Sequence, residues 1–172
     1  CYARTTHEYW VYSAGLDFER KILVKKNAPE LLEKAFQKKN WESSPIMFSG
    51  NTDCYQPIER KLEITRKMLG VCLKYKHPVS MITKNALIVR DLDILSELAK
   101  LRLAHVMVTI TSLDDDLRLK LEPRTVTYKN RMRAVKMLAD AGIPVGIMTA
   151  PIIPGLTSHE IPELIKTAAE NG

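Results

Sequence analysis

The sequence predicts an α/β fold in which parallel strands are covered by helices. Four short apolar runs alternate with longer segments whose apolar residues recur with the period of a helix. No Asn-Gly or Asp-Gly pair separates one apolar run from the next, so tight hairpins do not join the strands. Strands that alternate with helices in this way form a parallel sheet through right-handed crossovers.

The first forty residues predict less regular structure. Residues 1–18 are polar and aromatic without a clear period, which predicts a loop or a broken helix. The apolar centre of residues 21–25 predicts a short strand. Asn27, with Glu30 three residues later, has the spacing of a capping box and predicts a helix over 28–39.

Four strand-loop-helix units follow. The strands are predicted over 46–48, 79–83, 106–111 and 145–149. Pro57 opens the helix after the first strand, where its missing N–H costs no hydrogen bond. Asp91 is predicted to cap the next helix, and Gly142 to end the helix over 128–141. Glu160 is expected in the first turn of the last helix.

The composition limits the classes of partner and the location that we expect for the protein. The 172 residues include 26 Lys and Arg against 20 Asp and Glu, a net charge of +6, which permits nucleic acid or another anionic partner without requiring one. No apolar run approaches the ~20 residues of a membrane span, and the start of the chain has no signal-peptide core. We therefore expect no membrane association and a cytoplasmic location.

The three cysteines, Cys1, Cys54 and Cys72, have no mutual spacing typical of a disulfide or a zinc site. Cys72 lies in a helical pattern and is predicted to be a small core residue. The first residue is Cys1 rather than Met, so we expect the chain to be part of a longer one.

Polar residues follow each predicted strand, whereas the strand starts lack them. They are Asn51-Thr52-Asp53, Thr83-Lys84-Asn85, Thr111-Ser112 and Thr149-Ala150. Because ligands bind at the carboxyl ends of parallel strands, this asymmetry predicts a polar site at that edge of the sheet. The alternative explanation is local, since Asn, Asp, Ser and Thr also stabilise turns and cap helices.

Several short motifs share one resemblance. They are Cys1-Tyr-Ala-Arg, Thr6-His-Glu-Tyr, the segment 51–59, Leu121-Glu-Pro-Arg and Ala150-Pro-Ile-Ile-Pro-Gly. Together they resemble the radical S-adenosylmethionine (radical SAM) superfamily, in the branch grouped with spore photoproduct lyase and often called DNA repair photolyase-like. The resemblance implies a partial (β/α) TIM-like barrel with parallel strands and outer helices, lacking its first and last strands. It implies one core domain over 1–172, incomplete at both ends, with a cluster loop at 1–18 and β/α units at 46–172.

The resemblance also implies the chemistry. Such enzymes use a [4Fe–4S] cluster held by three cysteines to cleave S-adenosylmethionine to a 5′-deoxyadenosyl radical, which abstracts hydrogen from a substrate. Cys1 matches the last cluster cysteine, and the other two are expected upstream of it, so the chain alone is expected to be inactive. The resemblance does not identify the substrate, which could be DNA or another nucleic acid, as it is for spore photoproduct lyase. The expected reductant is a flavodoxin or a ferredoxin.

The site residues follow from matching positions. The expected cofactor-binding residues are Asn51, Thr52, Asp53, Lys84, Thr111, Ser112, Met148, Ala150 and Ile153. The residues at 51–53 would hold the methionine amine, and Lys84 would bind the methionine carboxylate. Thr111 and Ser112 would contact the carboxylate or the ribose. The three residues after the fourth strand would cover the adenine. Tyr2 and Tyr9 are candidates for relaying a hydrogen atom.

Cys54 is a further catalytic candidate, although relatives commonly carry proline there and the lyase places its hydrogen-donor cysteine nearer Gly50. Glu122 and Arg124 would either form an ion pair or face the substrate.

Two other functions are compatible with the sequence. A non-catalytic basic module that binds nucleic acid or protein would account for the net charge of +6 without any chemistry. A phosphate-binding α/β barrel enzyme is disfavoured, because the chain has only 7 glycines and no glycine-rich phosphate loop.

Overall fold

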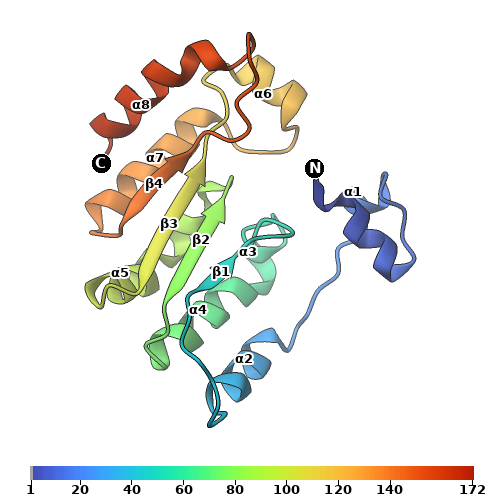
Figure 1. The fold of residues 1–172 in the computed structure, drawn as a ribbon, viewed down its shortest axis with the longest axis vertical. Helices are drawn as coiled ribbons and strands as arrows, with labels where there is room; N and C mark the ends of the chain where they lie inside the picture. The colour runs from blue at the N-terminus through green and yellow to red at the C-terminus, as the bar shows by residue number, and fades with distance from the viewer. Residues whose placement is uncertain (1) are drawn as a thin grey trace.

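The computed structural model describes residues 2–172, and its centre is an open sheet of four parallel strands (Figure 1). The strands are β1 (Ile46–Phe48), β2 (Val79–Thr83), β3 (Ala104–Thr109) and β4 (Val145–Met148). Their order in the sheet is β1-β2-β3-β4, the same as their order in the chain. Each crossover therefore moves one strand along in the same direction, as in a barrel. The predicted α/β fold with parallel strands is confirmed, and the open sheet is consistent with part of a barrel.

The helices lie between the strands in the chain and pack around the sheet. After β1 come α3 (Glu59–Leu62) and α4 (Ile64–Lys74); after β2 come η2 (Ala86–Asp91) and α5 (Leu92–Lys100); after β3 come α6 (Asp115–Leu121) and α7 (Tyr128–Asp140); after β4 come η3 (Ser158–Glu160) and α8 (Ile161–Glu170). Ahead of β1 lie η1 (Tyr2–Trp10), α1 (Asp17–Arg20) and α2 (Ala28–Phe36). Figure 1 shows η1 and α1 beside the sheet, joined to α2 by an extended segment.

The core lies between the sheet and the helices that cover it. Met81 of β2, Val106 of β3, Leu69 of α4 and Leu98 of α5 are fully buried in one apolar cluster. Burial of such side chains is the dominant favourable contribution to folding. Cys72 is fully buried in the same cluster, which confirms its prediction as a core residue.

The structure shows how two helix ends are stabilised, and it confirms the one predicted at Gly142. The Asp114 carboxylate accepts from the N–H groups of Asp116 and Leu117 at 2.8 and 3.2 Å and so caps α6. Gly142, with φ of 73°, follows the end of α7. Its N–H donates to the carbonyl of Ala139, and the N–H of residue 143 donates to the carbonyl of residue 138, the bond pair of a Schellman motif.

Three local predictions near the start of the chain are wrong. Residues 21–25 are extended but form no strand, because they pair with none of the four strands. Asn27 makes no capping bond with its side chain; α2 instead has Pro29 in its first turn, and it ends at Phe36 rather than near residue 39. A capping box needs a backbone geometry that the residue pattern alone does not fix.

The helix predicted after Pro57 is divided in two. Glu63 has a left-handed backbone, with φ of 53°, and separates α3 from α4. The Glu59 carboxylate accepts from the N–H groups of Ile64 and Thr65, both at 3.1 Å, and caps α4 from a distance in sequence. The division is therefore stabilised by a side chain of the preceding helical turn.

Asp91 and the ends of two strands also differ from prediction. Asp91 precedes α5 but makes no capping bond, because its carboxylate is bound by other side chains. β3 begins and ends two residues earlier than predicted, so Thr111 and Ser112 lie in the loop beyond it. β4 ends at Met148, one residue early.

Candidate site at the carboxyl edge of the sheet

Asp53 ties the loop after β1 to the end of β2. One carboxylate oxygen accepts from the Tyr55 N–H at 2.8 Å and from the Thr83 hydroxyl at 2.7 Å. The other accepts from the N–H of Lys84 at 2.7 Å. The two neighbouring strand ends that the sequence predicts to form a site are thus brought together. Both oxygens of Asp53 already have donors from within the chain.

Lys84 begins a chain of alternating charges. Its ammonium nitrogen lies 2.5 Å from one oxygen of Glu122, and the other oxygen of Glu122 lies 2.8 Å from the Arg131 guanidinium. Burial raises the pKa of Glu122, but its bonds to Lys84 and Arg131 outweigh burial and hold the pKa below its usual value. Arg131 also donates to the carbonyl of Thr109, the last residue of β3, at 2.8 Å. The charged groups therefore connect the ends of β1, β2 and β3.

The predicted partnership of Glu122 and Arg124 does not occur. Glu122 binds Lys84 and Arg131, whereas Arg124 is exposed and pairs with Glu19 of α1 at 3.2 Å. Both residues therefore form ion pairs, with different partners.

Arg131 is a site residue that was not predicted. Its side chain is 1% exposed, although arginine is rarely buried without a partner. The sequence does carry a signal, because residue 131 falls on the same helical stripe as the buried Val135 and Leu138. An arginine on a core stripe requires a buried acceptor, and here Glu122 and the Thr109 carbonyl supply it.

Thr111 and Ser112 are buried in the loop after β3. The Ser112 hydroxyl donates to Glu160 at 3.1 Å, and the other oxygen of Glu160 accepts from the N–H of Leu113 at 2.9 Å. Glu160, expected only as a residue of a helix start, thus fixes this loop to the loop after β4. Around the latter loop Met148 and Ile153 are half-buried and Ala150 is exposed.

The loop after β1 also contacts the N-terminal segment. The Asn51 side-chain amide donates to the Thr6 hydroxyl at 3.2 Å, and both Asn51 and Thr52 are exposed. Tyr9 lies on η1 and is 88% exposed. Cys1 lies outside the described residues, as does the side chain of Tyr2, so the structure does not place either of these candidates.

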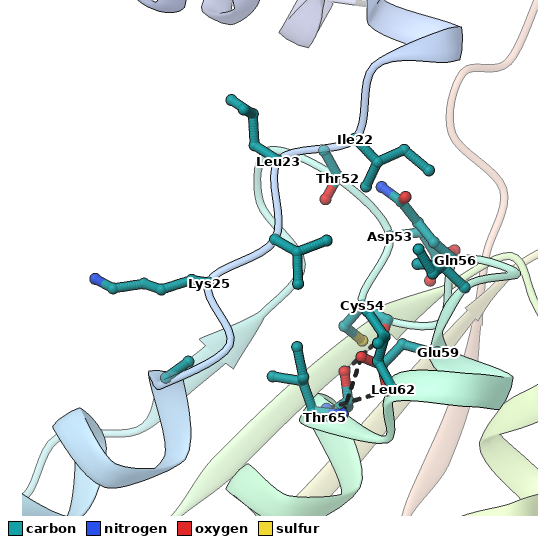
Figure 2. Close-up of a pocket in the computed structure, with 14 residues that line it drawn as sticks. Ile22, Leu23, Lys25, Thr52, Asp53, Cys54, Gln56, Glu59, Leu62 and Thr65 are labelled. Carbon is teal, nitrogen blue, oxygen red and sulfur yellow. Dashed lines mark hydrogen bonds between the residues drawn. The ribbon is translucent and has the colours of Figure 1, made fainter.

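Cys54 borders a shallow cavity of about 180 Å³. Figure 2 shows the cavity between the extended segment that carries Ile22 and Leu23 and the loop and helices that carry Cys54, Glu59 and Thr65. Burial raises the pKa of the Cys54 thiol to about 12, so the thiol keeps its proton at neutral pH. The catalytic assignment of Cys54 stays a prediction.

The described residues do not provide a cluster site. Between residues 2 and 172, no three His, Cys, Asp or Glu side chains converge as a metal site would require. Cys54 and Cys72 are unpaired, and neither belongs to a group of three possible metal ligands among these residues. The structure therefore assigns no cluster ligand among the described residues, and Cys1 stays the ligand that the sequence resemblance implies.

No helix in the described part of the chain has the length and apolar character needed to cross a membrane.

The sequence is similar to several curated proteins. An uncharacterized protein of Mycobacterium tuberculosis is 31% identical over 157 residues, covering 91% of this chain and 46% of that protein. An uncharacterized protein of Methanocaldococcus jannaschii is 29% identical over 160 residues, covering 93% of this chain and 57% of that protein.

An uncharacterized protein of Acidianus two-tailed virus is 26% identical over 159 residues, covering 90% of this chain and 51% of that protein. The chain thus spans about half the length of the curated relatives it matches. No solved structure matches it. The radical SAM superfamily matches residues 1–168, nearly the whole chain. With its parallel sheet and polar carboxyl edge, the chain belongs to the radical SAM superfamily.

Proposed function

We propose that this chain is the S-adenosylmethionine-binding core of a radical SAM enzyme, with the cofactor at the carboxyl edge of the sheet. The observation that carries the proposal is the series of charged groups Asp53, Lys84, Glu122 and Arg131, which links three consecutive strand ends. The methionine part of the cofactor is zwitterionic and needs a cation and oxygen acceptors close together. Lys84 offers the cation, and the exposed side chains of Asn51 and Thr52 on the neighbouring loop offer the oxygen acceptors.

Lys84 is the residue we assign to the cofactor carboxylate. Its side chain is 38% exposed, so the ammonium has donors available beyond its bond to Glu122. Asn51 and Thr52 are exposed on the neighbouring loop and would accept from the methionine amine. Asp53 supports them indirectly, because its oxygens fix the backbone at Lys84.

The loops after β3 and β4 would bind the rest of the cofactor. Thr111 and Ser112 offer hydroxyl groups near the end of β3, with Ser112 oriented by Glu160. Met148, Ala150 and Ile153 follow β4 and would cover the adenine with apolar surface. These assignments follow the positions of relatives and are proposals for this chain.

A [4Fe–4S] cluster, when bound, would supply the electron that cleaves S-adenosylmethionine to methionine and a 5′-deoxyadenosyl radical. Cys1 is the ligand that we assign to it in this chain. A cluster of the usual kind needs three thiolates, so we propose that the chain is inactive without ligands from elsewhere. The role that we propose for the described residues is to bind and orient S-adenosylmethionine.

The substrate class and partners are further proposals. The net charge of +6 supports an anionic substrate, and nucleic acid is the one that the lyase-like motifs favour. A flavodoxin or ferredoxin would be the reductant. The candidates for hydrogen-atom transfer are Tyr2, Tyr9 and Cys54. We also propose a cytoplasmic location for the protein.

Equilibrium dialysis tests the binding proposal without a cluster. Lys84→Met should weaken binding of S-adenosylmethionine by about tenfold, because a hydrogen bond between charged groups is lost. It should leave methylthioadenosine, which lacks the carboxylate, unaffected. Lys74→Met is the matched control, since Lys74 also pairs with a glutamate at 2.5 Å but lies on α4. Equal loss with both nucleosides, or none, would contradict the assignment of Lys84.

A second function rests on the charge alone. A basic binding module without chemistry would bind DNA with an affinity that falls steeply with salt. It would show no binding of S-adenosylmethionine. Measuring both ligands on the same protein separates the two functions.

A further inference from the structure

Glu122 lies between two cations that differ in burial. One of its carboxylate oxygens lies 2.5 Å from the Lys84 ammonium, and the other lies 2.8 Å from the Arg131 guanidinium. The side chain of Arg131 is 1% exposed and that of Glu122 is 9% exposed, whereas that of Lys84 is 38% exposed. The three charges therefore form a row that leads from the core to the surface, with Lys84 at the solvent end.

Arg131 is fixed in place, because each nitrogen of its guanidinium group donates a hydrogen bond. Nε donates to the carbonyl of Val126 at 3.0 Å, and Nη1 donates to the carbonyl of Thr109 at 2.8 Å. Nη2 donates to the Thr125 hydroxyl at 2.6 Å as well as to Glu122. A planar group held at every nitrogen has one orientation, so its positive charge stays beside Glu122.

Lys84 is fixed by its backbone but not by its side chain. Its N–H donates to the Asp53 carboxylate at 2.7 Å, directly after β2. Its ammonium has three N–H donors, and Glu122 is their one hydrogen-bond partner among the residues that the structure describes. The ammonium can therefore turn toward a ligand while its backbone stays in place.

The availability of Lys84 depends on the charge that its departure would leave on Glu122. A carboxylate left buried without a counter-ion is strongly unfavourable, so Glu122 by itself would hold the ammonium tightly. Burial raises the pKa of Glu122, but its bonds to Lys84 and Arg131 together hold the pKa below its usual value, so the carboxylate is ionised at neutral pH. Arg131 removes most of the penalty, because its charge remains beside Glu122 wherever the ammonium of Lys84 lies.

We propose that Arg131 is a positioning residue that acts through Glu122: it neutralises this carboxylate from the buried side and so leaves the Lys84 ammonium free to bind the carboxylate of a ligand. Two cations and one anion carry a net charge of +1, whereas Lys84 and Glu122 alone would carry none. This surplus charge reaches solvent at Lys84. The application to S-adenosylmethionine rests on the proposed function, whereas the release of Lys84 does not.

Acetylation of Lys84 by acetic anhydride, followed by mass spectrometry of the purified chain, tests the release without a cofactor. Arg131→Gln should slow this acetylation about fivefold, because Glu122 then holds the ammonium alone. Glu122→Gln should change it by less than about threefold, and the double variant should match Glu122→Gln. Lys74 is the matched control in the same samples, since its ammonium also lies 2.5 Å from a glutamate but on α4. Its acetylation should be the same in every variant.

Equilibrium dialysis with S-adenosylmethionine applies the same variants to binding. Arg131→Gln should weaken binding about tenfold in the otherwise unchanged chain, and by less than about twofold in a chain that also carries Glu122→Gln. Methylthioadenosine, which lacks the carboxylate, should bind all variants alike. An equal loss of binding with and without Glu122→Gln would show that Arg131 does not act through Glu122, and it would overturn the inference.

Two further outcomes are decisive. If Arg131→Gln alone does not fold, Glu122→Gln decides: its affinity for S-adenosylmethionine should rise by less than about threefold, because Arg131 already neutralises Glu122. A tenfold rise would show that Glu122 holds Lys84 alone, contrary to the proposal.

The two readouts also separate this role of Arg131 from the proposed function. If the unchanged chain fails to bind S-adenosylmethionine while Lys84 acetylation follows the expected pattern, the proposed function fails and the control of Lys84 by Arg131 stands. If the cofactor binds but Arg131→Gln leaves Lys84 acetylation unchanged, the function stands and the role of Arg131 is rejected.

Discussion

The Tyr55 hydroxyl donates a hydrogen bond of 3.0 Å to Asp91, and neither residue is exposed to solvent. Tyr55 belongs to the loop after β1, and Asp91 lies at the start of α5, so the bond joins two consecutive β/α units. The Asp91 carboxylate also binds the guanidinium groups of Arg66 and Arg90, at 3.1 and 2.8 Å. The position of the loop that contains Asp53 and Cys54 therefore depends on a buried charge.

Removing the hydroxyl or the charge should have unequal effects on stability. Tyr55→Phe should lower the free energy of unfolding by about 1 kcal/mol, because Asp91 retains both arginines. Asp91→Asn should cost more, about 3 kcal/mol, because the half-buried Arg90 guanidinium loses its main counter-ion, whereas Arg66 keeps Asp93. Urea denaturation measures both, with Tyr9→Phe on the exposed face of η1 as the control. A larger loss for Tyr55→Phe than for Asp91→Asn would be contrary to this account.

Glu122 should make the fold sensitive to acid. Its pKa in the folded protein is lowered, because the bonds to Lys84 and Arg131 outweigh burial. A lowered pKa stabilises the fold above the pKa of the unfolded chain, and this stability is lost as pH falls through the folded value. Glu122→Gln should therefore reduce the loss of stability on acidification from neutral pH, as followed by urea midpoints at several pH values. An unchanged pH dependence in the variant would exclude Glu122 as a cause.

Cys54 and Cys72 should lower the stability of the fold at alkaline pH. Burial raises both thiol pKa values from 9.0 to about 12, so the folded state favours the protonated thiol. Stability from a raised pKa is complete below the unfolded value and is lost as pH rises from about 9 to about 12. Cys54→Ala should flatten this alkaline decline. At pH 8 iodoacetamide should modify Cys54 more slowly than a free cysteine peptide, and equal rates would show an exposed thiolate.

Two glycines should respond in opposite ways to substitution by alanine. Gly142 has φ of 73°, so Gly142→Ala should destabilise the fold by about 1 kcal/mol. Gly70 lies inside α4, and an added Cβ would meet nothing within 4 Å, so Gly70→Ala should stabilise by about 0.5–1 kcal/mol. Thermal or urea unfolding of the two variants measures the pair. Effects of the same sign would mean that one of the two backbone assignments is wrong.

The strands were largely predictable, because their signal is local. The strands over 46–48 and 79–83 have the predicted bounds, since each is a short apolar run that ends at polar residues. Residues 21–25 have a similar pattern and form no strand, because a strand also needs a partner edge, which a local pattern does not report. The division of the helix after Pro57 was not predictable for a similar reason. It depends on the hydrogen bond that the Glu59 carboxylate accepts from the Ile64 N–H, which the apolar pattern does not report.

The candidate site was predictable in place but not in its bonds. Polar residues after parallel strands predicted the edge of the sheet, and Asp53 and Lys84 do meet there. The partner of Lys84 was not predictable, because Glu122 lies 38 residues further along the chain. Arg131 was missed although its place on the buried stripe of α7 required an acceptor. Sequence pattern thus locates such a site, and long-range charge pairing decides which side chains are available.

The order of the strands has a consequence for how the chain folds. Because the order in the sheet is the order in the chain, every strand pairs only with strands adjacent to it in sequence. Pairing of these four strands therefore requires only the closing of loops the length of one β/α unit, which keeps the entropic barrier to each step small. We expect the units to add one after another from the amino end during synthesis, each new strand finding its template already formed.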